Sequence, residues 1–176
     1  MSNNLNICSL NCQGLGKKEK RDRLYIWCEN QKCDILFIQE SHFTDKNINI
    51  INSETKCKIY HSFGNSLSRG VSILIKENIN HKIINEIKDE EGRFILINVE
   101  LDNNIFTLVN VYAPNIQRNR NSFFKKINNL IENNRLGILI LGGDINESLT
   151  ENDRKSTSTN HDLSPSPKPH LTAPVE

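Results

Sequence analysis

Residues 138–146 combine side chains that can do chemistry: four apolar residues, two glycines, an aspartate and, two positions later, an asparagine. The apolar run lacks helical spacing and predicts a short strand, buried on both faces, that ends at the glycines. If the chain stays extended there, Asp144 and Asn146 project to the same side, because strand side chains alternate with a period of two. A carboxylate and an amide would then meet at the carboxyl end of a strand, where open α/β sheets bind ligands. Ordinary turn chemistry explains the same residues, so this stretch alone leaves both interpretations open.

Other predicted strands end in polar side chains of similar character. Asn11 follows the first strand, Glu40 the second, and Tyr112 ends a later one. A hard cation such as Mg²⁺ takes oxygen ligands, usually one or two carboxylates with waters and substrate phosphates. Glu40 supplies such a carboxylate, Asp144 can orient a water nucleophile, and amides and a phenol can donate to phosphate oxygens. Metal-assisted phosphodiester hydrolysis needs these parts. Each residue alone also fits a turn or an exposed strand end, so the prediction depends on the set.

The elements that position these side chains follow from short apolar runs separated by polar turns. Strand, helix and strand within the first 38 residues indicate a βαβ-like opening, and residues 44–56 are expected to be irregular. A helix beginning at Asn121-Ser122 carries an apolar face. Two alternating strands joined by Asp102-Asn103-Asn104 predict a hairpin. The expected strands are 5–10, 35–38, 58–63, 70–75, 80–86, 94–101, 105–112 and 138–141, and the expected helices are 20–31 and 121–134.

Composition sets limits on function. At 176 residues the chain is long enough for one domain with a real core, and a net charge of +1 means that nucleic-acid binding needs a local basic face. The cysteines are odd in number and lack Cys-x-x-Cys spacing, which argues against a zinc site or a disulfide framework. No signal peptide and no membrane-spanning segment are apparent, so we expect an intracellular protein. The cysteines are Cys8, Cys12, Cys28, Cys33 and Cys57.

The composition changes near residue 150. From Glu151 onward the chain has no aromatic residue and no isoleucine, and four of the five prolines lie in the last twelve residues. Such a segment cannot bury much apolar surface. We therefore predict a domain over residues 1–150 and a disordered polar tail over 151–176.

Five segments in order carry a family resemblance: Leu-Asn-Cys-Gln-Gly-Leu at 10–15, Ile-Gln-Glu-Ser-His at 38–42, Arg-Gly-Val at 69–71, Val-Asn-Val-Tyr-Ala-Pro-Asn at 109–115 and Gly-Gly-Asp-Ile-Asn at 142–146. Over residues 5–152 the chain resembles the endonuclease domain of LINE-type (non-LTR) retrotransposons. That domain belongs to the endonuclease/exonuclease/phosphatase superfamily, with apurinic endonucleases and DNase I. The resemblance implies an α+β fold, a four-layered α/β sandwich with the site at one edge of two packed sheets.

The resemblance also implies residue roles and partners. Glu40 would be the ligand of Mg²⁺, with Mn²⁺ as an alternative, and Asn11 would lie near the metal and the attacked phosphate. Tyr112 would contact the phosphate, Asp144 would orient the attacking water, and Asn146 would stabilise the transition state. The activity implied is nicking of DNA, held by its phosphate backbone, in the nucleus and beside a reverse transcriptase.

One feature of the family is missing from this sequence. The family closes its site with further strands and an Asp-His pair usually preceded by serine, whereas here His161-Asp162 has the reverse order and lies in the polar tail. We interpret His161 and His170 as solvated. Our hypothesis is a C-terminally truncated copy whose hydrolysis is absent or weak, since one lost oxyanion-type donor costs on the order of 10²–10³ in rate. Open sheet edges would also favour self-association.

Three further residues are candidates for substrate contact. His42 follows Glu40 by two positions and would point to the same side of an extended strand, where it either lines the cleft or is exposed to solvent. Arg118 and Arg120 follow the Tyr112 segment and would reach phosphate if that loop borders the cleft. The basic run at 17–23 suits DNA contact or nuclear localisation, although a solvated helix start is the favoured interpretation.

Two other functions stay open. One is a phosphatase or phosphodiesterase of the same superfamily that acts on a lipid or inositol phosphate. The other is a non-catalytic remnant that binds nucleic acid or a protein partner.

Overall fold

The computed structural model describes residues 4–65 and 67–147, and Met1–Asn146 form one compact unit. The predicted disordered tail, residues 151–176 with His161 and His170, lies outside the described residues. Among the residues that are described, no helix is long and apolar enough to cross a lipid bilayer.

The first of two four-stranded sheets has the order β1-β2-β4-β3. Its strands are β1 (Ile7–Asn11), β2 (Ile35–Gln39), β3 (Cys57–Ser62) and β4 (Val71–Lys76). β1 and β2 run parallel, which confirms the βαβ-like opening, and β4 pairs antiparallel with both β2 and β3.

The second sheet has the order β5-β6-β7-β8. Its strands are β5 (His81–Lys88), β6 (Phe94–Leu101), β7 (Asn104–Tyr112) and β8 (Ile138–Asp144). The first three are antiparallel, and β8 returns parallel to β7 after a helical crossover. The predicted β6–β7 hairpin is confirmed, but its turn has two residues: Asp102 and Asn103 both have positive φ, as a tight hairpin turn requires.

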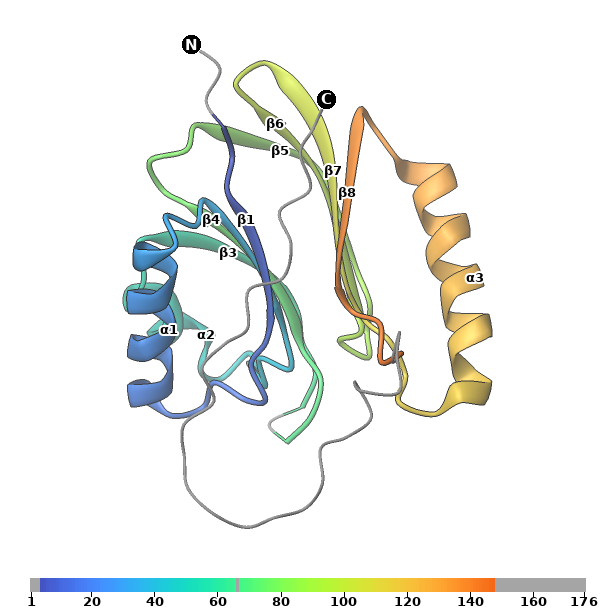
Figure 1. Ribbon diagram of the computed structural model, residues 1–176, viewed down its shortest axis with the longest axis horizontal. Helices are drawn as coiled ribbons and strands as arrows, with labels where there is room; N and C mark the ends of the chain where they lie inside the picture. The colour runs from blue at the N-terminus through green and yellow to red at the C-terminus, as the bar shows by residue number, and fades with distance from the viewer. Residues whose placement is uncertain (1–3, 66, 148–176) are drawn as a thin grey trace. The chain divides into compact units, whose positions relative to one another are not determined.

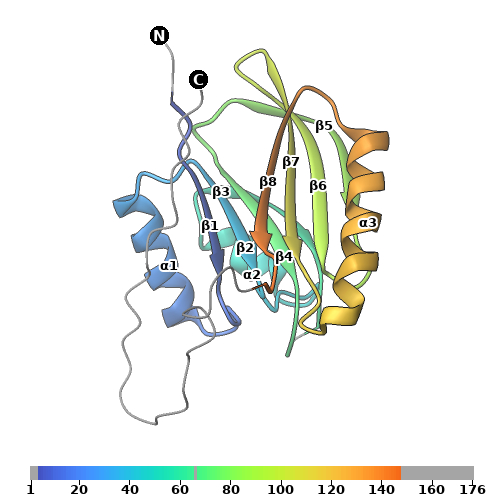
Figure 2. The same ribbon diagram turned by 45° about the vertical axis from the view of Figure 1, so that its right-hand side comes forward.

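Helices cover the outer faces of the sheets, as Figures 1 and 2 show. α1 (Lys18–Asn30) and α2 (Ile48–Ser53) lie on the first sheet, and α3 (Gln117–Asn134) lies on the second. Three apolar clusters separate the layers: one between α1, α2 and the first sheet, one between the two sheets, and one beneath α3. The described unit is therefore a four-layered α/β/β/α sandwich.

The side chains of β2 alternate between its two faces, so this strand packs against the helices on one face and against the second sheet on the other. All of its residues are buried, and Ile35 and Phe37 face the other sheet while Leu36 and Ile38 face the helices. A continuous apolar run is what a strand covered on both faces requires.

Two sequence-based expectations about helices were wrong in detail. The segment 44–56 contains the short helix α2, because Ile48 and Ile51 bury against the first sheet. α3 begins at Gln117, four residues before the expected Asn121 cap, and its N-cap residue Ile116 makes no capping hydrogen bond through its side chain. Local polar signals therefore misplaced one helix start and missed a helix that tertiary packing stabilises.

β8 also departs from expectation. It was predicted to be buried on both faces and to end at the glycines, but it pairs with β7 alone among the described strands and runs on to Asp144. Ile138 and Leu141 are 54% and 52% exposed. Gly142 lets the strand pass close to the first sheet, since a Cβ there would lie 2.7 Å from the Phe37 ring. An apolar run in the sequence does not show whether both faces of the resulting strand are covered by other parts of the fold.

A buried polar network joins the sheets beneath the carboxyl ends of β1 and β2. Asn110 on β7 is fully buried, and its Nδ2 donates at 2.8 Å to each of the carbonyl oxygens of Ile38 and Ser72. Its Oδ1 accepts from Gln39 Nε2 at 2.7 Å, and the same Gln39 nitrogen donates to Ser9 Oγ at 3.1 Å. The network fixes β7 against the β2–β4 pair.

Replacement of Asn110 by alanine is expected to lower the free energy of unfolding by about 2–4 kcal/mol, because two buried carbonyls and the Gln39 amide lose their partners. Urea denaturation followed by circular dichroism measures the change. The control Asn128→Ala, at an exposed position of α3, should stay within about 0.5 kcal/mol of the unmodified chain. Equal stability of the Asn110→Ala variant would show that the network is dispensable.

Candidate active site

Two parallel strand pairs end at the same end of the sandwich, one in each sheet (Figure 1). Asn11 is the register partner of Gln39, and Tyr112 is the register partner of Asp144. The chain then continues as paired backbone, with Gly14 N donating to Glu40 O at 2.7 Å and Ala113 N donating to Asp144 O at 2.8 Å. This hydrogen bonding brings together the strand ends on which the sequence placed the candidate residues.

The side-chain amide of Asn11 bridges the two sheets. Its Nδ2 donates to Glu40 Oε1 at 2.8 Å and to Asp144 Oδ2 at 2.7 Å. Its Oδ1 accepts from the backbone N–H of Gln13 at 3.0 Å, which fixes which end of the amide faces the carboxylates. Two acidic side chains that are distant in sequence therefore share a single donor group.

Glu40 and His42 lie on a turn rather than on extended chain. Their φ angles are +51° and +56°, in the left-handed region, which corrects the expectation that they share one side of a strand. His42 Nε2 still lies 3.8 Å from Glu40 Oε2, and it makes no hydrogen bond within the described part of the chain. A Cβ on Gly14 would lie 2.7 Å from His42 Nδ1, so only glycine leaves room for this ring.

Asn146 also departs from the extended geometry. It has φ +51°, and its backbone N–H donates to Asp144 Oδ1 at 2.9 Å, so the two residues form a turn. The side chains therefore do not project in parallel, as an extended strand would have required. Asn146 Nδ2 donates to Ala113 O at 2.6 Å and to Asn115 Oδ1 at 3.1 Å, which ties the segment after β8 to the segment after β7.

Tyr112 is almost buried beside these turns. It is 8% exposed, its hydroxyl donates to Asn115 Oδ1 at 3.3 Å, and the guanidinium of Arg93 lies 5.8 Å from its ring centroid. Neither Asn115 nor Arg93 was singled out as a site residue from sequence. Asn115 was detectable as the last residue of the Tyr-Ala-Pro-Asn segment, whereas no local signal marks Arg93, which the β5–β6 turn brings to the site.

The two arginines after Tyr112 differ in their surroundings. Arg118 is exposed, whereas Arg120 is 9% exposed and directs Nη1 at the backbone carbonyl oxygens of Asn115 and Asn146. Contact of either arginine with phosphate stays a prediction.

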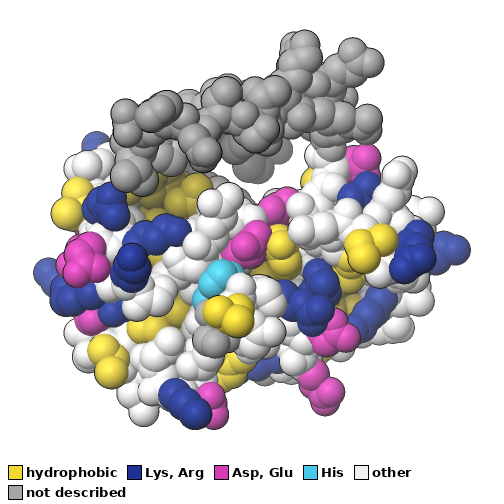
Figure 3. All heavy atoms as spheres, turned by 90° about the horizontal axis from the view of Figure 1, so that it is seen from below, with side chains coloured by type: hydrophobic (Ala, Val, Ile, Leu, Met, Phe, Trp, Pro, Cys, Tyr) yellow, Lys and Arg dark blue, Asp and Glu magenta, His cyan; other side chains and the backbone are white. Residues whose placement is uncertain are grey.

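The basic run at 17–23 is mostly engaged within the protein. Arg21 is 7% exposed and holds Glu54 through two nitrogens at 2.6 and 2.9 Å, and Lys18 pairs with Asp22 at 2.8 Å. The interpretation as a helix start agrees with these pairs. Figure 3 shows the molecule from below, at the end where the candidate residues lie. Lysines and arginines lie there on both sides of a central area with acidic side chains and a histidine.

The sequence also matches a known protein family. The family model of the Endonuclease/Exonuclease/phosphatase family matches residues 5–174. The chain belongs to this family.

The relatives of this family member include a transposon protein. Over 151 residues the chain is 26% identical to the Transposon TX1 uncharacterized 149 kDa protein of Xenopus laevis, covering 85% of the chain and 12% of that protein. This distant homology confirms the predicted resemblance to a retrotransposon protein.

Solved structures share the fold of this family member. D. rerio TDP2 complexed with single strand DNA product has a TM-score of 0.62 at 15% identity, over 82% of the chain and 61% of that structure. An AP endonuclease from Archaeoglobus fulgidus has a TM-score of 0.61 at 15% identity, over 80% of the chain and 57% of that structure. These matches establish a DNase I-like, two-sheet fold, and the chain spans about three fifths of their length.

The donor set of the site suits a hard cation. Glu40 and Asp144 share the Asn11 amide and so concentrate negative charge at one point, which a divalent cation would offset. No group of three or more His, Cys, Asp or Glu side chains arranged to hold a metal occurs among the described residues. Mg²⁺ needs only one or two carboxylates when waters and substrate phosphates complete its coordination, so Glu40 fits this requirement.

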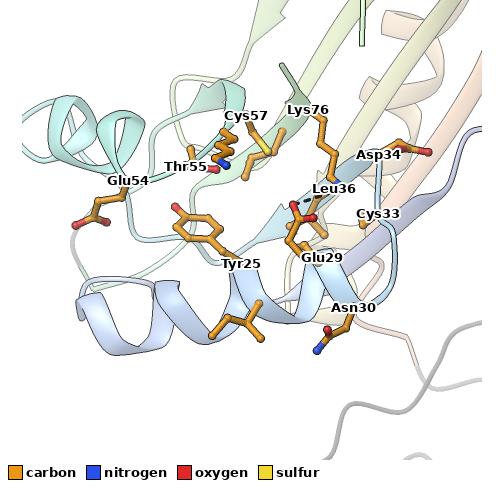
Figure 4. Close-up of a pocket in the computed structure, with 14 residues that line it drawn as sticks. Tyr25, Glu29, Asn30, Cys33, Asp34, Leu36, Glu54, Thr55, Cys57 and Lys76 are labelled. Atoms are coloured by element: carbon orange, nitrogen blue, oxygen red, sulfur yellow. Dashed lines mark ion pairs between the residues drawn. The ribbon is translucent and has the colours of Figure 1, made fainter. Parts of the chain in front are cut away.

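A separate cavity of about 370 Å³ lies between α1 and the first sheet (Figure 4). Its lining mixes apolar side chains and thiols, such as Leu36 and Cys57, with charged side chains such as the Lys76–Glu29 ion pair. Burial raises the pKa of the Cys57 thiol, so this group stays uncharged. Its lining includes none of the candidate site residues, and the five cysteines are free.

The pKa of the Tyr112 phenol depends on its burial and on the nearby Glu40 carboxylate. Burial raises its pKa above 10, and interaction with the Glu40 carboxylate raises it further. Because the charged form is disfavoured in the folded state, the contribution of this group to stability is lost as pH rises through that elevated pKa.

In Glu40→Gln the pKa of Tyr112 should fall but stay above 10, because burial is the larger cause and remains. NMR titration of ¹³Cζ-labelled tyrosine measures it, with Tyr112→Phe identifying the signal. Glu90→Gln, at an exposed position, should leave the titration unchanged. An unchanged Tyr112 pKa in Glu40→Gln would contradict a direct electrostatic contact.

Proposed function

We propose that this site carries out divalent-metal-dependent hydrolysis of phosphodiester bonds in DNA, as the nicking endonuclease of a retrotransposon. The observation that carries the proposal is the Asn11 amide, which holds a carboxylate from the end of each sheet beside Tyr112. Family membership supports hydrolysis of phosphate esters as the reaction class, and the distant homology to a transposon protein supports the biological setting.

Glu40 is the residue that would hold Mg²⁺, or Mn²⁺ in its place. When bound, such an ion stabilises charge on the attacked phosphate and orients it. Asn11 restrains the Glu40 carboxylate through Oε1, at 2.8 Å, which leaves Oε2 directed toward His42 and away from the shared amide. A carboxylate already fixed by a hydrogen bond loses little freedom when it binds a cation.

Asp144 would orient the attacking water. Its two oxygens accept from Asn11 Nδ2 and Asn146 N, at 2.7 and 2.9 Å, so the carboxylate is held at a fixed angle. Each oxygen retains a further acceptor position, which a water can use. Preorganised groups of this kind lower the barrier because they need no rearrangement during reaction.

The phosphate would lie where two donors converge. Tyr112 O–H and Asn146 Nδ2 both point at Asn115 Oδ1, at 3.3 and 3.1 Å. A phosphate oxygen that replaces Asn115 Oδ1 would receive both hydrogen bonds, which gives Tyr112 a binding role and Asn146 a transition-state role. Arg118 and His42 are proposed as further substrate contacts.

DNA is the proposed substrate because of the relatives. The D. rerio TDP2 structure contains a single strand DNA product, and the basic side chains at the site end of this chain suit a polyanion. A nuclear location would follow from access to chromosomal DNA.

The test is nicking of supercoiled plasmid with Mg²⁺. Nicking should vanish in Glu40→Ala and with EDTA, and should persist in Glu90→Gln. Because the sequence has His161-Asp162 in the reverse of the family's Asp-His order, we expect the 176-residue chain to nick DNA at least about 10²-fold more slowly than a complete family enzyme.

Absence of nicking by the folded chain, with DNA binding retained in a mobility-shift assay, would overturn hydrolysis and favour the nucleic-acid-binding remnant. Release of inorganic phosphate from a phosphomonoester without plasmid nicking would instead favour a phosphatase.

Self-association through the outer edge of β8 is a further expectation. Leu141 is 52% exposed on a strand that pairs on one side only among the described strands, and such edges can pair with a second copy. Sedimentation velocity should show weight-average mass rising with concentration, and Leu141→Lys should reduce the rise. Ile26→Lys, at a 62% exposed position of α1, is the matched control. A mass independent of concentration would contradict this expectation.

A further inference from the structure

A nearly buried arginine lies behind the two turns that carry the candidate residues. Arg120, in the first turns of α3, is 9% exposed. Its Nη1 donates to Asn146 O at 2.7 Å and to Asn115 O at 3.2 Å. Each Nη atom of a guanidinium carries two hydrogens, so one nitrogen serves both carbonyl groups.

The two carbonyls belong to segments that are far apart in sequence. Asn115 follows β7 and Asn146 follows β8, and the whole of α3 lies between them. Asn146 Nδ2 donates back to Ala113 O at 2.6 Å, so the segments are joined from both sides. Without Arg120, the carbonyl groups of Asn115 and Asn146 would lose the cationic donor that they share.

Asn146 has φ +51°, in the left-handed region, which asparagine adopts more readily than most residues other than glycine. The hydrogen bonds around Asn146 therefore select this turn among the conformations open to the residue. Through this conformation, its N–H reaches Asp144 Oδ1 and its amide reaches Asn115 Oδ1. A change in the backbone of Asn146 would therefore alter the hydrogen bonding of both neighbours.

We propose that Arg120 is a positioning residue that holds the turn after β7 and the turn after β8 in register. It acts on Asp144 and Asn146 through the backbone and does not need to touch the substrate. The planar guanidinium matters more than its charge, because its plane fixes the directions of both N–H bonds of Nη1, whereas a lysine ammonium is a point charge with rotatable donors on a flexible stem. The effect on hydrolysis rests on the proposed function, whereas the effect on the turns does not.

The test compares Arg120→Lys with Arg118→Lys, which changes an exposed arginine two positions earlier in the same helix. Amide hydrogen exchange measured by NMR should show the Asn146 N–H exchanging at least tenfold faster in Arg120→Lys. The amides of the core strands, such as those of Ile97 and Val109, should exchange as before. Arg118→Lys should change neither set.

Two results would overturn the proposal. Unchanged exchange at Asn146 in Arg120→Lys would mean that the arginine does not hold the turn, as expected if it serves the phosphate directly. An equal rise at every amide would mean that Arg120 stabilises the whole domain rather than these turns.

The consequence for catalysis has its own measurement. If the proposed function holds, Arg120→Lys should lower kcat for plasmid nicking at least tenfold and leave KM for DNA nearly unchanged. A rise in KM with kcat unchanged would contradict positioning and indicate substrate contact. If the unmodified chain does not nick DNA, the exchange experiment still decides whether Arg120 holds the turns, so failure of one proposal is distinguishable from failure of the other.

Discussion

The hydrogen bonds of Asn110 are the interaction on which the site depends most. This side chain is fully buried between the sheets and contacts Gln39, Ile38 and Ser72, immediately beneath the strand ends. Apolar packing between sheets is tolerant of small sliding movements, whereas a set of directed hydrogen bonds permits one register. With that register set, Asn11 on one sheet reaches Asp144 on the other.

The candidate site therefore lies between the two sheets, and neither sheet alone carries all of its residues. The first sheet brings Glu40 and Asn11, and the second brings Tyr112, Asp144 and Asn146. Three candidate residues, Glu40, His42 and Asn146, adopt left-handed backbone. Asparagine adopts this region readily, whereas at Glu40 and His42 the conformation persists because surrounding contacts hold the turn.

Sequence reasoning succeeded where the information is local. The apolar run before Glu40 and the alternating strands before Tyr112 predicted the strands and, with them, the ends at which polar groups gather. It failed where contacts between distant segments decide: the exposure of β8, the burial of Arg120 and the bonds between Gln39 and Asn110 depend on neighbours far away in the chain. The turn at Asn146 was one of two interpretations that the sequence left open, and the backbone of the folded chain, with φ +51° at Asn146, agrees with it.

The contact between Asn11 and Asp144 spans 133 positions of sequence. Closing so long a loop costs entropy before any contact compensates for it, and domains rich in such contacts fold slowly. During synthesis the first sheet is complete once β4 has left the ribosome, but Glu40 then has no opposing carboxylate. The candidate residues of the two sheets can therefore meet only after residues 144–146 have been synthesised.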